Sequence, residues 1–160
     1  MTPSQTKIEP RFENGRSMLV AGLRASYTMA TADGIPALWQ RFVAFGRLPN
    51  MIGNVYYGAC FPTPTGFDYM CCVEVPDAAG IRPELTHVTV PAQRYAVFAH
   101  REHVSKLRHT LDYIWHNWFP TSGYKPVQPT RGAPAFYERY GEKFNPVTGM
   151  DDIEVWMPIS

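Results

Sequence analysis

The stretch RYAVFAHREHVSKLRHTLDYIWHNWFP, residues 94–120, joins a strand pattern to the clearest helix pattern in the chain. Its first seven residues, RYAVFAH, form an apolar and aromatic run of the kind that favours a strand. The next apolar residues recur at intervals of three and four and so form one stripe on a helix: Val104, Leu107, Leu111, Ile114, Trp115 and Trp118. Pro120 and Gly123 end this helix. The stretch therefore predicts a strand followed by an amphipathic helix.

The same order of elements occurs twice. Strands are predicted after the helix over residues 135–140 and 153–159. Upstream, a strand over 18–27 precedes a helix in which Asp33 is the N-cap, Pro36 lies in the first turn, and Trp39 lies on the apolar face. Two strands follow that helix, and a short extended segment then leads into the second unit; these three runs cover residues 54–61, 67–75 and 85–90.

Two βαββ units, over about residues 16–76 and 85–160, suggest an internal duplication. The fold class is therefore α+β, in a single domain over residues 16–160. Residues 1–15 are expected to form a flexible leader because they are polar and lack periodicity. A duplicated unit often forms its ligand site between the two halves.

The composition limits the classes of function. Hydrophobic residues make up 45% of the chain and charged residues 18%, which is enough apolar material for a core. The formal net charge of +1 gives no basic surface for nucleic acid and no polybasic membrane patch. No membrane-length apolar run or signal peptide is present, so the protein is expected in the cytoplasm. The odd number of cysteines, Cys60, Cys71 and Cys72, suggests no disulfide framework.

Glu138 is the main candidate for a ligand contact. It lies in the aromatic run FYERY, where Phe136, Glu138 and Tyr140 share one face of the strand. An ionised carboxylate on an apolar face is costly unless a partner neutralises it, and a cationic ligand would do so. Neighbouring aromatic faces would add cation–π attraction. The alternative is that Glu138 faces solvent beside Arg139 as a surface ion pair, which contributes little.

Other aromatic residues are candidates for the wall of the same pocket. Tyr57 precedes Gly58, where the missing side chain leaves room for a close approach; the alternative is a core tyrosine beside a bulge. Trp115 and Trp118 both need partners for their N–H groups, and Trp118 is the better candidate for lining a cleft. Trp39 on the first helix is its counterpart in the other unit, although a Trp on an apolar helix face can also be core.

No catalytic residue, metal site or cofactor is predicted. The five histidines are not joined by cysteines or carboxylates at metal-ligand spacing. Nucleophile-elbow, phosphate-loop and dinucleotide motifs do not occur.

Six motifs in a fixed order resemble one known family. They are YYGACF (residues 56–61), FDYMCCVEV (67–75), VPAQRYAVFAHR (90–101), IWHNWFPTSGY (114–124), FYERY (136–140) and IEVWMPI (153–159). The set resembles the GyrI-like, or AraC-type, effector-binding superfamily and looks closest to its stand-alone, integron-associated branch. The resemblance covers about residues 18–159. It departs from the family pattern in the lead Ala135-Phe136-Tyr137 and in GEKFNPVTG, which lengthens the last hairpin.

This resemblance implies a duplicated βαββ fold with a curved antiparallel sheet, two helices and a central ligand pocket. It also implies binding of lipophilic, often cationic compounds, with Glu138 as the central acidic residue and Tyr140 two places on. We therefore expect a small-molecule binding protein or sensor that lacks its own DNA-binding domain. One alternative is a hydrolase that uses the pocket glutamate, which turnover of the ligand would reveal. Another is a protein-interaction module of the gyrase-inhibitor type, which pull-down of a partner would reveal.

Overall fold

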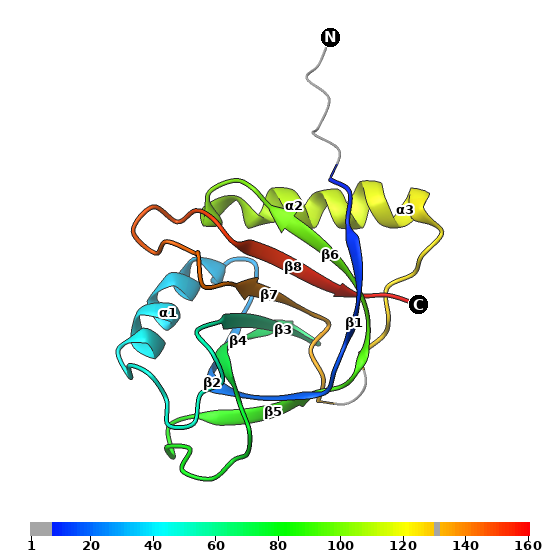
Figure 1. Cartoon of the computed structure of the whole chain (residues 1–160). Coiled ribbons are helices and arrows are strands. Elements are labelled where there is room, and N and C mark those ends of the chain that lie inside the picture. The colour runs from blue at the N-terminus through cyan, green and yellow to red at the C-terminus, as the bar shows by residue number, and fades with distance from the viewer. Residues whose placement is uncertain (1–7, 130–131) are drawn as a thin grey trace.

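The computed structural model describes residues 8–129 and 132–160. In this part of the chain eight strands form one antiparallel sheet, and the helices pack against it (Figure 1). The strands are β1 (Arg11–Gly15), β2 (Met18–Tyr27), β3 (Tyr56–Thr63), β4 (Gly66–Val75), β5 (Thr86–Val90), β6 (Gln93–His100), β7 (Phe136–Tyr140) and β8 (Ile153–Pro158). The helices are α1 (Ile35–Val43), α2 (Leu107–Tyr113) and α3 (Phe119–Ser122), with a π-helical segment at Ile114–Trp118 between the last two. The α+β class is confirmed.

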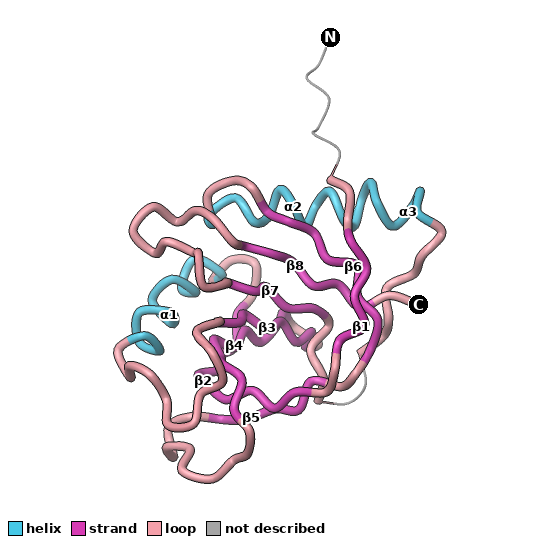
Figure 2. The backbone as a smooth tube through the Cα atoms, in the orientation of Figure 1, coloured by secondary structure: helices cyan, strands magenta, loops and turns pink. Residues whose placement is uncertain are grey.

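The two units meet in the middle of the sheet. The strand order is β1-β6-β8-β7-β3-β4-β2-β5, so the unit β2-α1-β3-β4 and the unit β6-α2-β7-β8 join where β3 pairs with β7. The sheet is strongly curled, and α1 and α2 lie on its outer side (Figures 1 and 2). The expected duplicated βαββ arrangement with a curved antiparallel sheet is confirmed, and its central seam is the β3–β7 pair.

The predicted helix over 104–118 forms as a chain of short segments. A 3₁₀ turn precedes α2, and the N–H of Phe119 then donates to the carbonyl of Ile114, five residues back. A regular α-helix would press the ring of Pro120 against the carbonyl of His116, and the wider π turn relieves that clash. Within the described residues, no helix is long and apolar enough to cross a membrane.

The N-terminal segment differs from the expected flexible leader. Residues 11–15 form β1, which pairs antiparallel with β6. Arg11 also bonds Glu154 of β8 at 2.5 Å, and the ring of Phe12 lies 5.2 Å from that of Tyr124. The sequence RFENG carries no strand alternation of its own, so its structure comes from these long-range partners. Residues 1–7 of the expected leader lie outside the described residues.

The two faces of the sheet carry separate apolar clusters. The outer face packs against the helices and includes Trp39, Tyr56, Tyr69 and Tyr140. The inner face of the curl holds another cluster, which includes Tyr57, Tyr95, Tyr137 and Trp156. Because side chains alternate along each strand, neighbours such as Tyr56 and Tyr57 belong to different clusters.

Candidate functional site

Glu138 lies at the centre of the sheet, on the face that the helices cover. In the register of the strands it stands opposite Val155 of β8 on one side and Gly58 of β3 on the other. Phe136 and Tyr140 lie on the same face, while Tyr137 belongs to the inner cluster. The side chain of Glu138 is only 7% exposed. The surface ion pair with Arg139 that the sequence left open does not form; Arg139 contacts Glu154 instead.

Two tyrosine hydroxyls hold one oxygen of this carboxylate. The hydroxyls of Tyr69 and Tyr140 each donate to Oε1 of Glu138 at 2.7 Å. Tyr69 comes from β4, the strand beyond β3, and its side chain reaches Glu138 by passing over Gly58. A Cβ atom at Gly58 would lie 2.0 Å from the Tyr69 hydroxyl oxygen, so only glycine permits this contact. Glycine at position 58 thus leaves the space through which Tyr69 reaches the carboxylate of Glu138.

Trp39 extends this network from helix α1. Its indole N–H donates to the Tyr69 hydroxyl at 3.1 Å. Because an indole nitrogen is only a donor, Tyr69 accepts from Trp39 and must direct its own proton to Glu138. The ring of Trp39 also meets that of Tyr140 edge-on, with centroids 5.3 Å apart, and lies parallel to that of Tyr56 at 6.4 Å. Glu138 therefore lies beneath a layer of aromatic side chains.

The second carboxylate oxygen, Oε2, has no such partners. Within residues 8–129 and 132–160 it receives no hydrogen bond, and Glu138 forms no ion pair. Among the described residues, the site thus contains one carboxylate oxygen that accepts no hydrogen bond.

Burial governs the protonation of the groups on this face. It raises the pKa of Glu138 above the ordinary value of 4.5, and the hydrogen bonds from Tyr69 and Tyr140 offset part of that rise. Burial also raises the pKa of both tyrosines and of the nearby thiols of Cys60 and Cys71, which therefore stay protonated. Glu138 has the lowest ordinary pKa of these groups, so it is the one whose ionised form a cationic partner would favour.

This raised pKa predicts how stability depends on pH. Because the folded protein holds the Glu138 proton more tightly than the unfolded chain does, the free energy of unfolding should fall as pH rises from about 4.5 through the folded pKa. Glu138→Gln removes that titration, so the stability of the variant relative to wild type should increase over the same range. Urea unfolding of both proteins between pH 4 and 8 measures the difference. A difference that stays constant with pH would contradict the raised pKa.

The other predicted ligand residues are distributed over both faces. Tyr57 lies on the inner face, where its ring meets that of Tyr137 at 5.4 Å, so it does not share a site with Glu138. Trp118 packs on Phe98 of β6, two strand spacings or about 10 Å from β7. Trp115 is 40% exposed on its helix. The structure thus brings Trp39, Tyr140 and Glu138 together, with Phe136 on the same face.

Sequence reasoning missed two residues of this cluster, Tyr56 and Tyr69. Tyr69 lies in FDYMCCVEV, a run with apolar residues on both faces, so no alternation identifies the side that it occupies. Tyr56 comes directly before Tyr57, and the sequence pattern favoured Tyr57 as the ligand residue. The signal that could have found both is the glycine between Tyr57 and Ala59, since a position without a side chain leaves room for one from a neighbouring strand on the face that Tyr56 shares.

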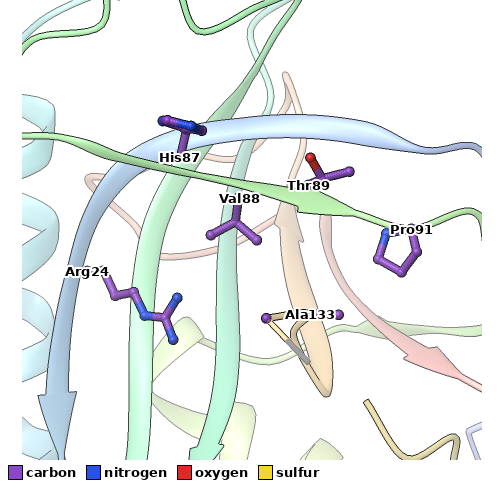
Figure 3. A pocket seen from close by; sticks show the side chains of 7 residues that line it. Arg24, His87, Val88, Thr89, Pro91 and Ala133 are labelled. Carbon is purple, nitrogen blue, oxygen red and sulfur yellow. The ribbon is translucent and has the colours of Figure 1, made fainter. Parts of the chain in front are cut away.

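A separate surface hollow lies away from this cluster. Figure 3 shows it beside β5, with an open volume of about 400 Å³ and with Arg24, Val88 and Ala133 among its lining residues. The guanidinium of Arg24 already bonds Asp68 at 3.0 Å and lies 3.8 Å from the centre of the Phe61 ring. None of the predicted ligand residues lines this hollow, so it is distinct from the site around Glu138.

Comparison with known proteins finds a matching family model and a curated relative. A model of the GyrI-like small molecule binding domain matches residues 8–160. The transcriptional regulator BrlR of Pseudomonas aeruginosa is 28% identical over an alignment of 136 residues, which covers 81% of this chain and 48% of BrlR, so the chain spans about half the length of that relative.

Two solved structures share the fold. SAV2435, solved bound to tetraphenylphosphonium, has a TM-score of 0.73 at 22% identity, over 95% of this chain and 94% of that one. An integron cassette protein from the mobile metagenome of Vibrio cholerae has a TM-score of 0.67 at 17% identity, over 96% of this chain and 97% of that one.

Proposed function

The chain belongs to the family of GyrI-like small-molecule binding domains, and on that premise we propose that it binds a lipophilic cation whose charge lies against Glu138. The observation that carries the proposal is the state of this carboxylate. It is buried, it forms no ion pair within the described residues, and its Oε2 accepts no hydrogen bond there. A buried charge of this kind is costly unless a counter-charge neutralises it.

The surroundings of Glu138 favour a cation with apolar substituents. The rings of Tyr56 and Tyr140 both pack against Trp39 on the face that carries Glu138, and the aromatic face of a tyrosine attracts a cation by about 0.5–2 kcal/mol depending on desolvation. Apolar groups on the ligand would replace water against these rings. Tetraphenylphosphonium, the ligand bound to SAV2435, combines a single positive charge with four aromatic groups. It is the class of compound that this arrangement would accept.

The proposal predicts discrimination by charge between compounds of similar shape. Methyltriphenylphosphonium should bind at least about tenfold more tightly than the neutral triphenylphosphine oxide, because only the cation meets the carboxylate with a charge-assisted contact. Isothermal titration calorimetry measures both constants, and mass spectrometry of each mixture checks that the compound is intact. Equal binding of the two would contradict the proposal, whereas consumption of a compound would favour the hydrolase alternative.

Location and partners form part of the same proposal. We place the protein in the cytoplasm, which the three unpaired cysteines support. The net charge of +1 supports a ligand other than nucleic acid. Binding of none of the lipophilic cations, together with capture of a protein partner, would favour the interaction-module alternative.

A further inference from the structure

Trp39 occupies the space directly above the proposed cation site. Its ring makes four aromatic contacts, with Phe42 on its own helix and with three tyrosines of the sheet: Tyr56, Tyr69 and Tyr140. Its N–H is bonded to the Tyr69 hydroxyl. Two of these tyrosines are the residues that bond Glu138. The indole therefore fills an aromatic chamber whose floor is the carboxylate.

A ring-bearing ligand and this indole cannot both occupy the chamber. Glu138 is 7% exposed, and the two tyrosines that bond its carboxylate, Tyr69 and Tyr140, both contact the Trp39 ring. A bulky cation could reach Oε2 only after one of the covering groups had moved. Tyr69 is 3% exposed and Tyr140 is 7% exposed, and both are bonded to the carboxylate. Trp39 is only half-buried, so it has a route toward solvent that Tyr69 and Tyr140 lack.

The side chain of Trp39 can leave without loss of helix α1. Its neighbours on the helix, Leu38 and Phe42, are each 3% exposed and anchor α1 on the sheet. Release of the indole also leaves the Tyr69 hydroxyl with an unused acceptor position, although its proton still goes to Glu138. The network that orients the carboxylate therefore survives the loss of its outermost member.

We propose that Trp39 is an internal occupant of the ligand chamber, which a ring-bearing cation must displace in order to bind. This inference rests on the proposed function. In the ligand-free protein the indole packs against the rings of Tyr56 and Tyr140, where the ligand would otherwise lie. Binding then exchanges one aromatic group for another, so Trp39 lowers affinity and excludes compounds that cannot compete with it for the aromatic contacts.

Substitution of Trp39 tests the sign of its contribution. If Trp39 is displaced, Trp39→Ala should lower the Kd for tetraphenylphosphonium by roughly three- to tenfold, because the fraction of chambers open to the ligand increases. Trp39→Phe keeps a ring but loses the N–H bond, so its Kd should lie between those of the other two proteins. If Trp39 is instead a wall residue that contacts the ligand, as the sequence suggested, both variants should bind more weakly. Weaker binding or an unchanged Kd would overturn the proposal.

A second measurement follows the indole itself. With 5-fluorotryptophan incorporated, the resonance of Trp39, identified by its absence from Trp39→Phe, should move toward the solvent-exposed value as tetraphenylphosphonium is added. Trp156→Phe, on the inner face, is the control and should bind as wild type does, with circular dichroism confirming the fold of every variant. A Trp39 resonance that stays unchanged at saturation would overturn the proposal. Failure of the wild type to bind any cation would instead refute the proposed function.

Discussion

Replacement of Glu138 by glutamine is expected to weaken the binding of lipophilic cations about ten- to hundredfold without unfolding the protein. A hydrogen bond or contact to a charged group contributes about 1.5–3 kcal/mol, and each 1.4 kcal/mol corresponds to a factor of ten in Kd. Glutamine has the shape of glutamate and keeps one carbonyl oxygen, which can still accept from the hydroxyls of Tyr69 and Tyr140. The variant should therefore lose the charge and keep the packing.

The controls separate charge at the site from charge on the whole protein. Glu142→Gln makes the same chemical change at an exposed position in the turn that follows β7, so it should leave cation binding unchanged. A neutral compound such as triphenylphosphine oxide should bind wild type and Glu138→Gln alike. If Glu138→Gln binds methyltriphenylphosphonium as tightly as wild type does, Glu138 is not the charged contact, and the proposed function loses the observation that carries it.

Much of the architecture is encoded locally and could be predicted from sequence. Apolar residues at intervals of three and four predicted the helices at 35–43 and 104–118. Apolar and aromatic runs on either side of turns rich in Pro and Gly predicted the strands from β2 onward. The alternation within FYERY also placed Phe136, Glu138 and Tyr140 on one face. Each of these inferences depends on residues close together in the chain. Strand β1 could not be predicted in this way because its order comes from β6, about 80 residues away.

The composition of the site depends on contacts that sequence patterns do not report. Trp39 and Tyr69 are 30 residues apart, and Tyr69 and Glu138 are 69 residues apart. Tyr57, whose role in ligand binding stays a prediction, lies on the opposite face from Glu138. The aromatic pair before Gly58 offers two candidates on opposite faces, and only the pairing of β3 with β7 shows that Tyr56 lies on the side of Glu138. The roles predicted for Trp115 and Trp118 in ligand binding stay predictions.

The seam between the two units explains why the site requires the whole domain. Trp39 and Tyr69 come from the first unit, while Glu138 and Tyr140 come from the second. Only the β3–β7 pair brings them together, and in that pair Gly58 stands opposite Glu138. Both the pairing of the two units and the hydrogen bond from Tyr69 to Glu138 therefore depend on Gly58.

Gly58→Ala is accordingly expected to abolish cation binding and to destabilise the protein by about 1–3 kcal/mol, the range for added volume in a packed core. The new Cβ would lie 2.0 Å from the Tyr69 hydroxyl oxygen and 2.9 Å from Oε1 of Glu138. The end of a flexible side chain could yield cheaply, but Tyr69 is buried and bonded at its hydroxyl to both Trp39 and Glu138. Its displacement must break the network that orients the carboxylate. Urea unfolding and calorimetric titration with methyltriphenylphosphonium measure the two effects.

Two further variants identify the cause of that loss. Gly53→Ala adds the same methyl group where nothing lies within 4 Å, so it should show only the strain of a positive φ, about 1–2 kcal/mol, and should bind the cation normally. Adding Tyr69→Phe to Gly58→Ala removes the oxygen atom nearest to the new methyl group. The double variant should therefore be more stable than the sum of the two single changes predicts, which a double-mutant cycle measures. Strict additivity would mean that the methyl group acts on another neighbour, and that Gly58 is not what allows Tyr69 to reach Glu138.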